Sequence, residues 1–544
     1  MFILDQKKRL QAAKWLFAAL VFASFFYITA ENRDPDLGWH LKTGEWILEH
    51  RAIQRFDKWS HTMSGYEWID HEWLLNAWMH WMNARGLWPI VIFFFSLLAS
   101  LPIIWSVRRA ASFLEILFIS AVSLEILRFI GVRPQLISFV FFAFLFEVLS
   151  NPYFKERFGV FRDFGIPLIF FVWANLHAGF PAGLLLLFLF IVGDLMGKKR
   201  RAELTAVAAL KHAAVLLASF LATLITPHGF DLYHEIWNVA TSSLTAKYIV
   251  EWLPAFALLS PAVPFVIALP FIFFFKYFRR YAMPMALAFA AFSALYLKSS
   301  RNIFFYAVAA MPVMRQGSAL LKEEIARAEA RRPAPRGVAR LTAFIKIFLV
   351  GALIAYWCYA LYASPRSQIG RPESALQFLK QEVGRGKPVK LLNAYSWGGY
   401  IIAQAPEIKV FIDGRMPHWK DESGNSAMEE YAQLFYSDNN GAKRDILARR
   451  GINTILLGAE QDPPKDGWIA RLIERLPEER RERIGKSRTL QLLNKALSFP
   501  ESLVYGETTD LREVLREDGW EIAYEDDVAA VFRCPEYKCA PSPP

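Results

Sequence analysis

KKRLQAAKWLFAALVFASFFYITAENRDPD, residues 7–36, places three basic residues, an apolar run and an acidic turn in succession. The apolar run covers residues 13–30, close to the ~20 residues that a helix needs to cross a bilayer. It lacks the small-residue cleavage site of a secretory signal peptide, and charged residues follow it directly. We therefore expect a retained transmembrane helix that delivers Asp34 to the far side of a membrane.

Similar apolar runs recur along the first two thirds of the chain. The composition agrees, because 54% of the 544 residues are hydrophobic and only 21% are charged. A soluble protein of this size would carry more charge on its surface. We predict an α-helical polytopic membrane protein with about eleven spans. The spans are expected near residues 13–30, 87–106, 112–130, 135–150, 165–177, 179–195, 204–226, 256–275, 281–298, 302–315 and 341–362.

Lysine and arginine clusters set the predicted orientation, because they gather in cytoplasmic loops. Lys7-Lys8-Arg9 put the N-terminus in the cytoplasm, and counting the spans alternately puts the later basic clusters on the same side. These clusters are Arg108-Arg109, Lys155 with Arg157 and Arg162, Lys198-Lys199-Arg200-Arg201, Lys276 with Arg279-Arg280, and Arg315 through Arg340. Orientation thus accounts for the net charge of +11, and we predict no nucleic-acid partner. The chain divides into a membrane domain, residues 1–362, and an extracytoplasmic domain, residues 363–544.

The C-terminal residues alternate helical and strand patterns, which predicts a small α/β domain. Helices are expected at Glu373–Val383 and Arg444–Arg450, strands at Val389–Asn393, Val410–Asp413 and Asn453–Leu457, and a hairpin from Trp520–Tyr524 and Val528–Arg533. The glycines of WGGY, residues 397–400, are expected to allow a tight turn. Asp413-Gly414-Arg415 is read as a turn with a salt bridge rather than as a ligand contact. Cys534 and Cys539 either form a small disulfide loop outside the cell or remain free thiols.

The loop between the first two spans, residues 31–86, is long for a connector. Segments Leu37–Glu49 and Glu67–Arg85 have the pattern of amphipathic interfacial helices. The second segment carries one polar stripe, formed by Glu72, Asn76, His80 and Asn83. Because tryptophan favours the membrane interface, anchoring is the preferred role for most of the tryptophans in this loop. They are Trp39, Trp46, Trp59, Trp68, Trp73, Trp78 and Trp81.

Asp34-Pro35-Asp36 stands where the chain leaves the bilayer. Proline disfavours a helical conformation in the residue before it, so the chain is expected to be extended at Asp34. Residues two apart in an extended chain face the same way, and both carboxylates would then converge. Such a pair can hold a divalent metal, or one member can act as a general base. The alternative is an N-cap and solvated turn before the next helix.

Other polar residues are expected at the same outward level as the DPD sequence. Ionisable residues at a membrane boundary are costly and often functional. Arginine in particular binds phosphate through its planar fork of donors. For each residue alone, snorkelling or helix capping is the simpler reading, but the set could bind a lipid phosphate. The set comprises Arg133, His177, His228, Glu251 and Arg301. Glu125 and Arg128, three apart in the third span, are read as a structural pair.

These residues resemble the GT-C class of membrane glycosyltransferases, in an uncharacterised bacterial branch. The resemblance covers nearly the whole chain and rests on motifs in a fixed order. They are DPDLGWHLKTGEWI (34–47), FDKWSHT (56–62), EWIDHEWL (67–74), VRPQL (132–136), WANLHAGF (173–180), the Pro-His-Gly of TPHGF (226–230), EWLP (251–254), SRNIFF (300–305), WGGYI (397–401) and FIDGR (411–415).

The resemblance implies an enzyme of the bacterial inner membrane that takes sugar from a polyprenyl-phosphate donor to an extracytoplasmic glycan, lipid or protein, with inversion. Asp34 or Asp36 would be the base or a ligand of Mg²⁺ or Mn²⁺. Arg133, Arg301 or His177 would stabilise the leaving phosphate. Pro35 separates two acids that many members carry side by side, which leaves the metal requirement open. The implied substrate-binding residues are His40, His71, Glu72, Arg133, His177, His228, Glu251 and Arg301.

Two other functions stay open at this point. A transporter would favour internal repeats and interrupted helices in matching halves. No convincing repeat is visible, although the polar break at residues 175–179 resembles such an interruption. A non-catalytic scaffold of envelope assembly would tolerate replacement of Asp34 and Asp36.

Overall fold

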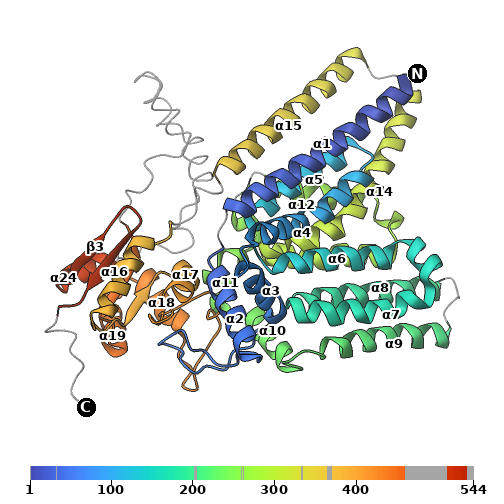
Figure 1. Ribbon diagram of the computed structural model, residues 1–544. Coiled ribbons are helices and arrows are strands. Elements are labelled where there is room, and N and C mark those ends of the chain that lie inside the picture. The colour runs from blue at the N-terminus through green and yellow to red at the C-terminus, as the bar shows by residue number, and fades with distance from the viewer. Residues whose placement is uncertain are drawn as a thin grey trace, which may run out of the picture.

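The computed structural model describes residues 2–31, 34–200, 205–258, 260, 262–331, 335–363, 370–459 and 511–535. Figure 1 shows a bundle of long helices with a smaller domain against one end. The bundle and its outer loops contain α1 (Phe2–Glu31), α2 (Leu37–His50), α3 (Trp73–Asn83), α4 (Trp88–Arg109), α5 (Phe113–Ile126), α6 (Gln135–Ser150), α7 (Pro152–Leu176), α8 (Phe180–Arg200), α9 (Ala206–Thr223), α10 (Asp231–Thr241), α11 (Ser243–Tyr248), α12 (Val263–Lys276), α13 (Met283–Lys298), α14 (Ile303–Arg331) and α15 (Arg336–Ala363).

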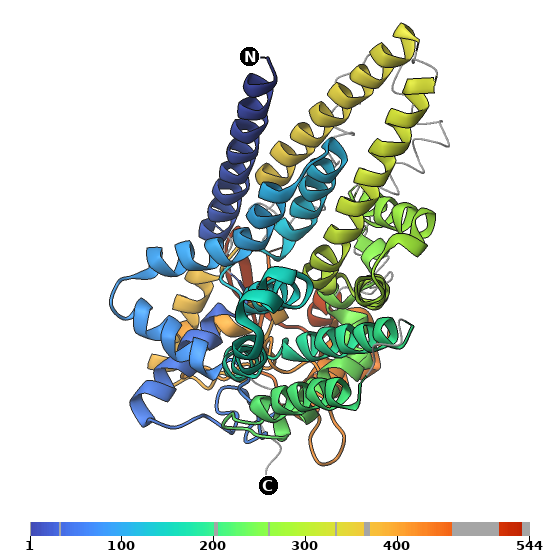
Figure 2. The ribbon, with the colours of Figure 1, turned by 90° about the vertical axis from the view of Figure 1, so that its right-hand side faces the viewer.

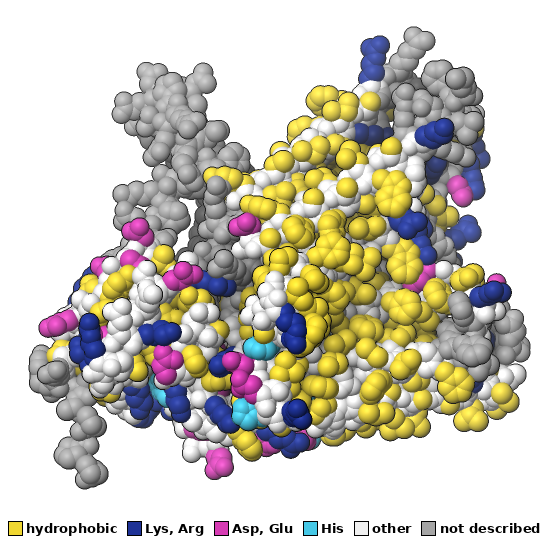
Figure 3. All heavy atoms as spheres, viewed as in Figure 1, with side chains coloured by type: hydrophobic (Ala, Val, Ile, Leu, Met, Phe, Trp, Pro, Cys, Tyr) yellow, Lys and Arg dark blue, Asp and Glu magenta, His cyan; other side chains and the backbone are white. Residues whose placement is uncertain are grey.

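Each predicted span overlaps one helix of this bundle. Five of the described helices, α1, α4, α8, α9 and α15, are long and apolar enough to cross a membrane. α6, α7, α12 and α13 contain shorter apolar stretches. Figure 3 shows hydrophobic side chains over the bundle and charged side chains gathered over the C-terminal domain. The helices therefore identify a membrane protein, while the number of spans remains a prediction.

Local sequence explains how helices in the bundle begin and meet. Ser112 caps α5: its hydroxyl accepts the Glu115 N–H at 3.2 Å and donates to the Glu115 carboxylate at 2.8 Å. The first bond is the N-cap of the helix, and the second holds the Glu115 carboxylate against the same hydroxyl. The Ser318 hydroxyl of α14 donates to the same carboxylate at 2.8 Å, so the cap also joins two helices.

α15 lies beside α1 at the edge of the bundle (Figures 1 and 2). The indole N–H of Trp357 donates to the Ser24 hydroxyl at 2.9 Å. Only the C-terminal half of α15 is packed in this way, because residues 341–350 are all exposed. In a bilayer these side chains would face lipid.

The C-terminal domain is a small four-stranded sheet with helices. Its elements are α16 (Glu373–Gly384), β1 (Leu391–Asn393), α17 (Gly398–Gln404), α18 (Ala427–Tyr436), α19 (Asn440–Arg450), β2 (Thr454–Gly458), α24 (Leu511–Glu517), β3 (Glu521–Glu525) and β4 (Ala529–Arg533). The sheet order is β1-β2-β4-β3, with β1 parallel to β2 and the other pairs antiparallel. The α/β pattern and the hairpin are confirmed. Cys539 lies outside the described residues, so its pairing with Cys534 stays a prediction.

The predicted strand Val410–Asp413 is wrong. The side-chain amide of Asn393 accepts the Phe411 N–H at 2.8 Å and donates to the Ile412 carbonyl at 2.9 Å. One side chain therefore replaces the ladder that a strand would need. Val410 instead pairs with the first outer loop, accepting the His61 N–H at 3.0 Å.

The tryptophans of the first loop build this domain. Trp39, Trp59 and Trp68 are buried in one hydrophobic core with Leu391, Phe411 and other residues of the C-terminal domain. Interfacial anchoring is therefore wrong for these three. Membrane-facing indoles would be exposed, whereas these are at most 8% exposed. The loop thus belongs physically to both parts of the molecule.

α2 and α3 pack face to face, which explains the polar stripe of α3. A Cβ added at Gly44 would lie 2.0 Å from the Asn76 carbonyl oxygen, so the backbones approach closely at a glycine. His80 Nδ1 lies 3.1 Å from the Leu41 carbonyl oxygen. The stripe thus joins two helices instead of facing water. α3 begins only at Trp73, later than predicted, because residues 67–72 fold as an irregular segment.

Candidate active site

The DPD sequence forms a tight turn before α2. The Asp34 carbonyl accepts the Leu37 N–H at 3.2 Å, and Asp34 Oδ1 accepts the Asp36 N–H at 2.8 Å. Asp36 has φ −84° and ψ −17°, which is a helical conformation. The extended conformation of Asp34 stays a prediction, but the predicted convergence of the two carboxylates is wrong, because the chain turns at Pro35 and Asp36 and the Asp34 side chain closes this turn onto its own backbone. The two carboxylates consequently bind different partners.

The Asp36 carboxylate lies against the C-terminal domain. It makes no capping bond to α2, so the alternative prediction of a simple N-cap is also wrong. Its Oδ1 instead accepts the Trp39 indole N–H at 3.1 Å. A Cβ added at Gly414 would lie 1.7 Å from this oxygen. Burial and the charge of Asp34 raise the pKa of Asp36 to about 7, and the Trp39 bond opposes them.

Arg133 is held between two carboxylates, those of Asp34 and Glu251, with an ion pair to each. Burial opposes the charge of Arg133, but the two carboxylates outweigh it and hold its pKa above the ordinary value. Arg301 lies over the Trp252 ring at 4.6 Å, and its charge interacts with Glu251. Arg133, Glu251 and Arg301 of the predicted outward set therefore form one ion cluster with Asp34, in which Arg133 is paired and not snorkelling.

A cavity of about 340 Å³ adjoins this cluster. Three arginines line it: Arg128, Arg133 and Arg371. Asp34 and Pro35 form one wall, and Trp397, Tyr400 and Gln404 come from the WGGYI segment and α17. Arg128 also makes the predicted pair with Glu125, at 3.5 Å. A cavity with this lining suits an anionic group such as a phosphate.

Glu72 lies at the centre of three imidazoles. Its carboxylate is 3.5 Å from His40 Nδ1 and 3.6 Å from both His71 Nε2 and His177 Nε2. Burial raises the pKa of Glu72 well above its ordinary value, and the charge of Asp70 adds to this. Burial lowers the pKa of His40 to about 3 and that of His71 to about 4. Burial thus favours the uncharged form both of this carboxyl group and of the imidazoles around it.

Hydrogen bonds fix the tautomer of His177. Its Nδ1 accepts the Gly179 N–H at 2.9 Å. The Ser138 hydroxyl accepts the Trp173 indole N–H at 2.7 Å and lies 2.7 Å from the same Nδ1. Because Nδ1 accepts, the neutral ring carries its proton on Nε2, the atom that faces Glu72.

A second chain of bonds fixes the opposite tautomer in His40. The Asn76 amide donates to Asp70 Oδ1 at 3.0 Å, so its Oδ1 is left to accept from His40 Nδ1 at 2.7 Å. Asp70 also accepts the Glu72 N–H at 3.1 Å. His228 lies behind this chain, with Nε2 3.0 Å from the Asp70 carbonyl oxygen. Of the predicted residues, His228 thus contacts backbone and supports the loop.

Glycines bring the WGGYI segment onto the DPD turn. A Cβ added at Gly38 would lie 1.9 Å from the Gly399 carbonyl oxygen, and one at Gly399 would lie 2.3 Å from the Pro35 carbonyl oxygen. These glycines serve close approach between two segments, and the tight turn predicted for WGGY is not their role. Tyr395, just before them, interacts electrostatically with Asp36.

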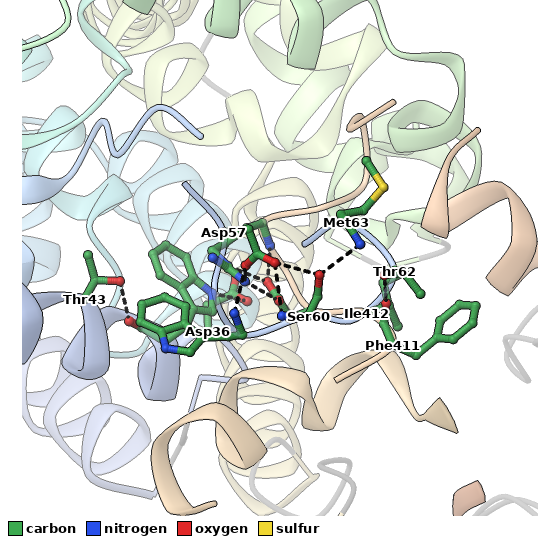
Figure 4. A network of polar contacts seen from close by, with 12 residues as sticks. Asp36, Thr43, Asp57, Ser60, Thr62, Met63, Phe411 and Ile412 are labelled. Carbon is green, nitrogen blue, oxygen red and sulfur yellow. Dashed lines mark hydrogen bonds and ion pairs between the residues drawn. The ribbon is translucent and has the colours of Figure 1, made fainter. Parts of the chain in front are cut away.

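The FIDGR segment is fixed by a buried ion triad of Arg415, Asp413 and Asp57. Figure 4 shows Asp57 within the surrounding polar network. Arg415 Nη2 lies 2.8 Å from Asp57 Oδ1 and 2.7 Å from Asp413 Oδ2. The guanidinium also lies over the rings of Trp59 and Trp419, at 4.9 and 5.2 Å. The predicted turn with a salt bridge is confirmed, and the bridge extends to the first loop. The ion triad therefore links the C-terminal domain to the first loop of the helix bundle.

Most of the predicted residues come together at this junction. Asp34, Asp36, Arg133, Glu251 and Arg301 form the ion cluster, and Glu72, His40, His71 and His177 lie beside it. Sequence reasoning missed Asp70, Asn76, Tyr395 and Arg371 as members of the site. Asn76 belonged to the recognised polar stripe, which was a usable signal. Arg371 stands in an ordinary polar stretch and carried none.

The described residues contain no group of three His, Cys, Asp or Glu side chains that could hold a metal ion. The Asp34 carboxylate is already paired with the Arg133 guanidinium. This donor set does not fit a divalent cation as it stands. Dependence on Mg²⁺ or Mn²⁺ stays a prediction, and no step below involves a metal.

Comparison with known proteins gives a fold but no family. No family model and no curated protein matches the chain. Among solved structures it is similar to the oligosaccharyltransferase AglB of Archaeoglobus fulgidus in complex with an inhibitory peptide and a dolichol-phosphate, with a TM-score of 0.55 and 10% identity over 98% of this chain and 75% of that one. The apo form of that enzyme aligns with a TM-score of 0.50 and 11% identity over 82% and 69% of the two chains.

A third structure, the same enzyme tethered to an acceptor peptide with the NVT sequon, gives a TM-score of 0.52 and 10% identity over 81% and 69%. At this identity the likeness concerns the fold alone. It agrees with the resemblance to membrane glycosyltransferases drawn from the sequence. This chain shares its fold with the oligosaccharyltransferase AglB of Archaeoglobus fulgidus.

Proposed function

We propose that the protein is a membrane glycosyltransferase that moves a sugar from a polyprenyl-phosphate donor to an extracytoplasmic acceptor. The acceptor is a glycan, a lipid or a protein. The proposed location is the bacterial inner membrane, with the N-terminus cytoplasmic and the C-terminal domain outside. The neighbouring solved structures contain a dolichol-phosphate and an acceptor peptide, which supports a lipid-linked donor.

The observation that carries the proposal is the Asp36 carboxylate. It lies at the junction of the DPD turn and the FIDGR segment, half-buried and with a pKa raised to about 7 by burial and by Asp34. A general base works best when its pKa lies near the operating pH. Asp34 is the weaker candidate, because its carboxylate is paired with Arg133.

The proposed step is a single displacement. Asp36 takes the proton of an acceptor hydroxyl as the hydroxyl oxygen forms a bond to the anomeric carbon. The bond between that carbon and the lipid phosphate oxygen breaks, and the electron pair leaves with the phosphate. One displacement inverts the configuration at the anomeric carbon.

The arginine-lined cavity would receive the phosphate. Negative charge grows on the leaving oxygen in the transition state, and positioned cations stabilise it there. Arg133 borders both the cavity and the DPD turn, whereas Arg128 and Arg371 line the other walls. The donor sugar would thus be brought next to Asp34 and Asp36.

A transfer assay tests the proposal. Membranes with equal amounts of wild type, Asp36→Asn, Asp34→Asn or Asp231→Asn are compared for release of polyprenyl phosphate from lipid-linked sugars. Asp231 is exposed at the start of α10 and is the matched control. Loss of a general base reduces a rate by about 10²–10⁴-fold, so we expect such a loss in Asp36→Asn and wild-type release in Asp231→Asn.

Two results would contradict the proposal in different ways. A collapse in Asp34→Asn with normal release in Asp36→Asn would assign the base to Asp34. Equal release in all four proteins would leave these carboxylates a structural role, and the transporter or scaffold function would then be preferred.

A further inference from the structure

A second cavity, of about 310 Å³, lies at the other end of the bundle. It is lined by residues of α7, α8, α9, the end of α6 and the start of α13. α8 connects the two ends: it begins at Phe180, next to the His177 site, and Lys198 near its other end lines this cavity. A rise of 1.5 Å per residue separates these two residues by ~27 Å, close to the thickness of a hydrocarbon core.

Five charged or ionisable side chains line this cavity. Lys211 Nζ lies 2.7 Å from Asp163 Oδ2, and Lys198 Nζ lies 3.0 Å from Asp194 Oδ2. His212 Nε2 lies 3.1 Å from the same Asp194 oxygen. Ionisable residues at a membrane boundary are commonly functional.

The side chains of the cavity keep hydrogen-bond donors for a further partner. His212 Nδ1 lies 2.6 Å from the Ala208 carbonyl oxygen, which can only accept. Its Nε2 faces the Asp194 carboxylate. Each lysine ammonium has three N–H donors and uses one for its aspartate, which leaves donors for an anion.

The rest of the lining is apolar. Ile166, Leu187, Phe190, Ile191 and Val215 form much of the wall. On the outside of α9, Val207, Leu210 and Leu217 are 77%, 72% and 58% exposed, as expected for a helix that faces lipid. The cavity thus combines a cationic group of side chains with a wall that suits acyl chains, next to a lipid-facing helix.

We propose that this cavity binds an anionic phospholipid, with its phosphate at Lys198, Lys211 and His212 and its acyl chains along the apolar wall. Basic pockets between membrane helices on the cytoplasmic side bind such headgroups. The cluster Lys198-Lys199-Arg200-Arg201 predicts that this end is cytoplasmic. The site is separate from the Asp36 junction, and the proposal does not depend on the proposed transferase activity.

Lipid retention in nanodiscs tests this inference. The full-length protein is placed in nanodiscs of equal parts phosphatidylglycerol and phosphatidylcholine, and bound lipid is measured by native mass spectrometry. We expect phosphatidylglycerol to be enriched several-fold, and each lysine to contribute about fivefold, the ~1 kcal/mol of one cation near anionic lipid. The paired variant Lys211→Gln/Asp163→Asn removes one cation without leaving its carboxylate unpaired.

A cavity-filling variant provides an independent arm. Ala208 lines the cavity, whereas Ala206 is exposed at the start of α9. Ala208→Leu should lose the enrichment with all charges retained, and the matched control Ala206→Leu should keep it. Equal retention of both lipids by wild type would overturn the proposal. A second result would also overturn it. If inorganic phosphate stabilises the protein in discs of phosphatidylcholine alone at least as much as phosphatidylglycerol does, the site takes a free anion and not a lipid headgroup.

Discussion

Asp36 and its neighbours predict a characteristic pH dependence. The carboxylate accepts a proton only when ionised, and its pKa is raised to about 7. We therefore expect kcat/KM to rise about tenfold for each pH unit below 7 and to level off above it. His40 and His71, with pKa values of about 3 and 4, stay neutral in this range and add no second limb.

The measurement is transfer by purified protein from about pH 5.5 to about pH 8.5, with Asp231→Asn as control. The control should follow the wild-type curve. A wild-type rate that does not change over this range would contradict the assignment of Asp36 as base.

Asp70 predicts a second pH effect, on stability. Burial raises its folded pKa from 3.8 to about 7, although two hydrogen bonds oppose the rise. Between these values the unfolded chain has lost the proton and the folded protein keeps it, so the free energy of unfolding falls as pH rises. Its Oδ2 has no hydrogen-bond partner among the described residues. Asp70→Asn keeps an acceptor for Glu72 and Asn76 and removes the charge.

We expect Asp70→Asn to be more stable than wild type at pH 8, by ~1–3 kcal/mol after the cost of an unpaired amide N–H. At pH 5 the gain should shrink. Thermal unfolding in nanodiscs at both pH values measures this. An equal change in unfolding temperature at pH 5 and at pH 8 would mean that packing, and not the protonation of Asp70, is responsible.

At the scale of residues, the sequence predicted which charged groups belong to the site better than it predicted which groups they contact. Arg133, Glu251 and His177 could be identified because ionisable residues at a membrane boundary are rarely incidental. The binding partners of Asp34 and Asp36 could not be identified from the sequence, because the turn that separates them is closed by a side chain. Arg371 and Asn393 act through contacts far along the chain, and no local pattern marks such contacts.

At the scale of elements, α17 and α2 meet through glycines, and this contact can be tested. A Cβ at Gly399 would lie 2.3 Å from the Pro35 carbonyl oxygen, a distance that forces the backbone to move. We expect Gly399→Ala to separate α17 from the DPD turn and to reduce transfer at least tenfold, since small misplacements cost about 10²-fold. Gly384→Ala is the matched control, because nothing lies within 4 Å of its added Cβ.

Transfer rate and proteolysis of the folded protein measure this effect. Wild-type activity and protease resistance in Gly399→Ala would show that the close approach is dispensable. Loss of both properties in Gly384→Ala as well would point to a general sensitivity of the domain.

Elements with strong periodicity or long apolar runs could be predicted, and those completed by tertiary contacts could not. The predicted spans each contain a helix because about 20 apolar residues leave few other structures in a membrane. The hairpin of β3 and β4 was also evident. Val410–Asp413 failed because Asn393 supplies the bonds of a missing strand, and α3 was predicted too long because Trp68 is drawn into another core.

At the scale of the whole molecule, the first loop and the C-terminal domain share one core. Trp59 and Trp68 lie in it, and Asp57 is joined to Arg415 and Asp413. Removing one partner of a buried ion pair is costly, about 3–5 kcal/mol. The C-terminal domain is thus a structural part of the candidate site, because the contacts around Asp36 depend on it.

The orientation of this whole assembly is the remaining large prediction. The C-terminal domain and the α14–α15 connection should lie on opposite sides of the membrane, because one predicted span, α15, lies between them. Glu329 of α14 and Lys420 of the domain are both exposed. In a Cys358→Ser background, Lys420→Cys should react with a membrane-impermeant maleimide in intact cells, and Glu329→Cys only after the membrane is opened. The Cys358→Ser parent measures labelling of Cys534 and Cys539. If both new cysteines react in intact cells, α15 does not cross the membrane between them, and the predicted span at residues 341–362 is wrong.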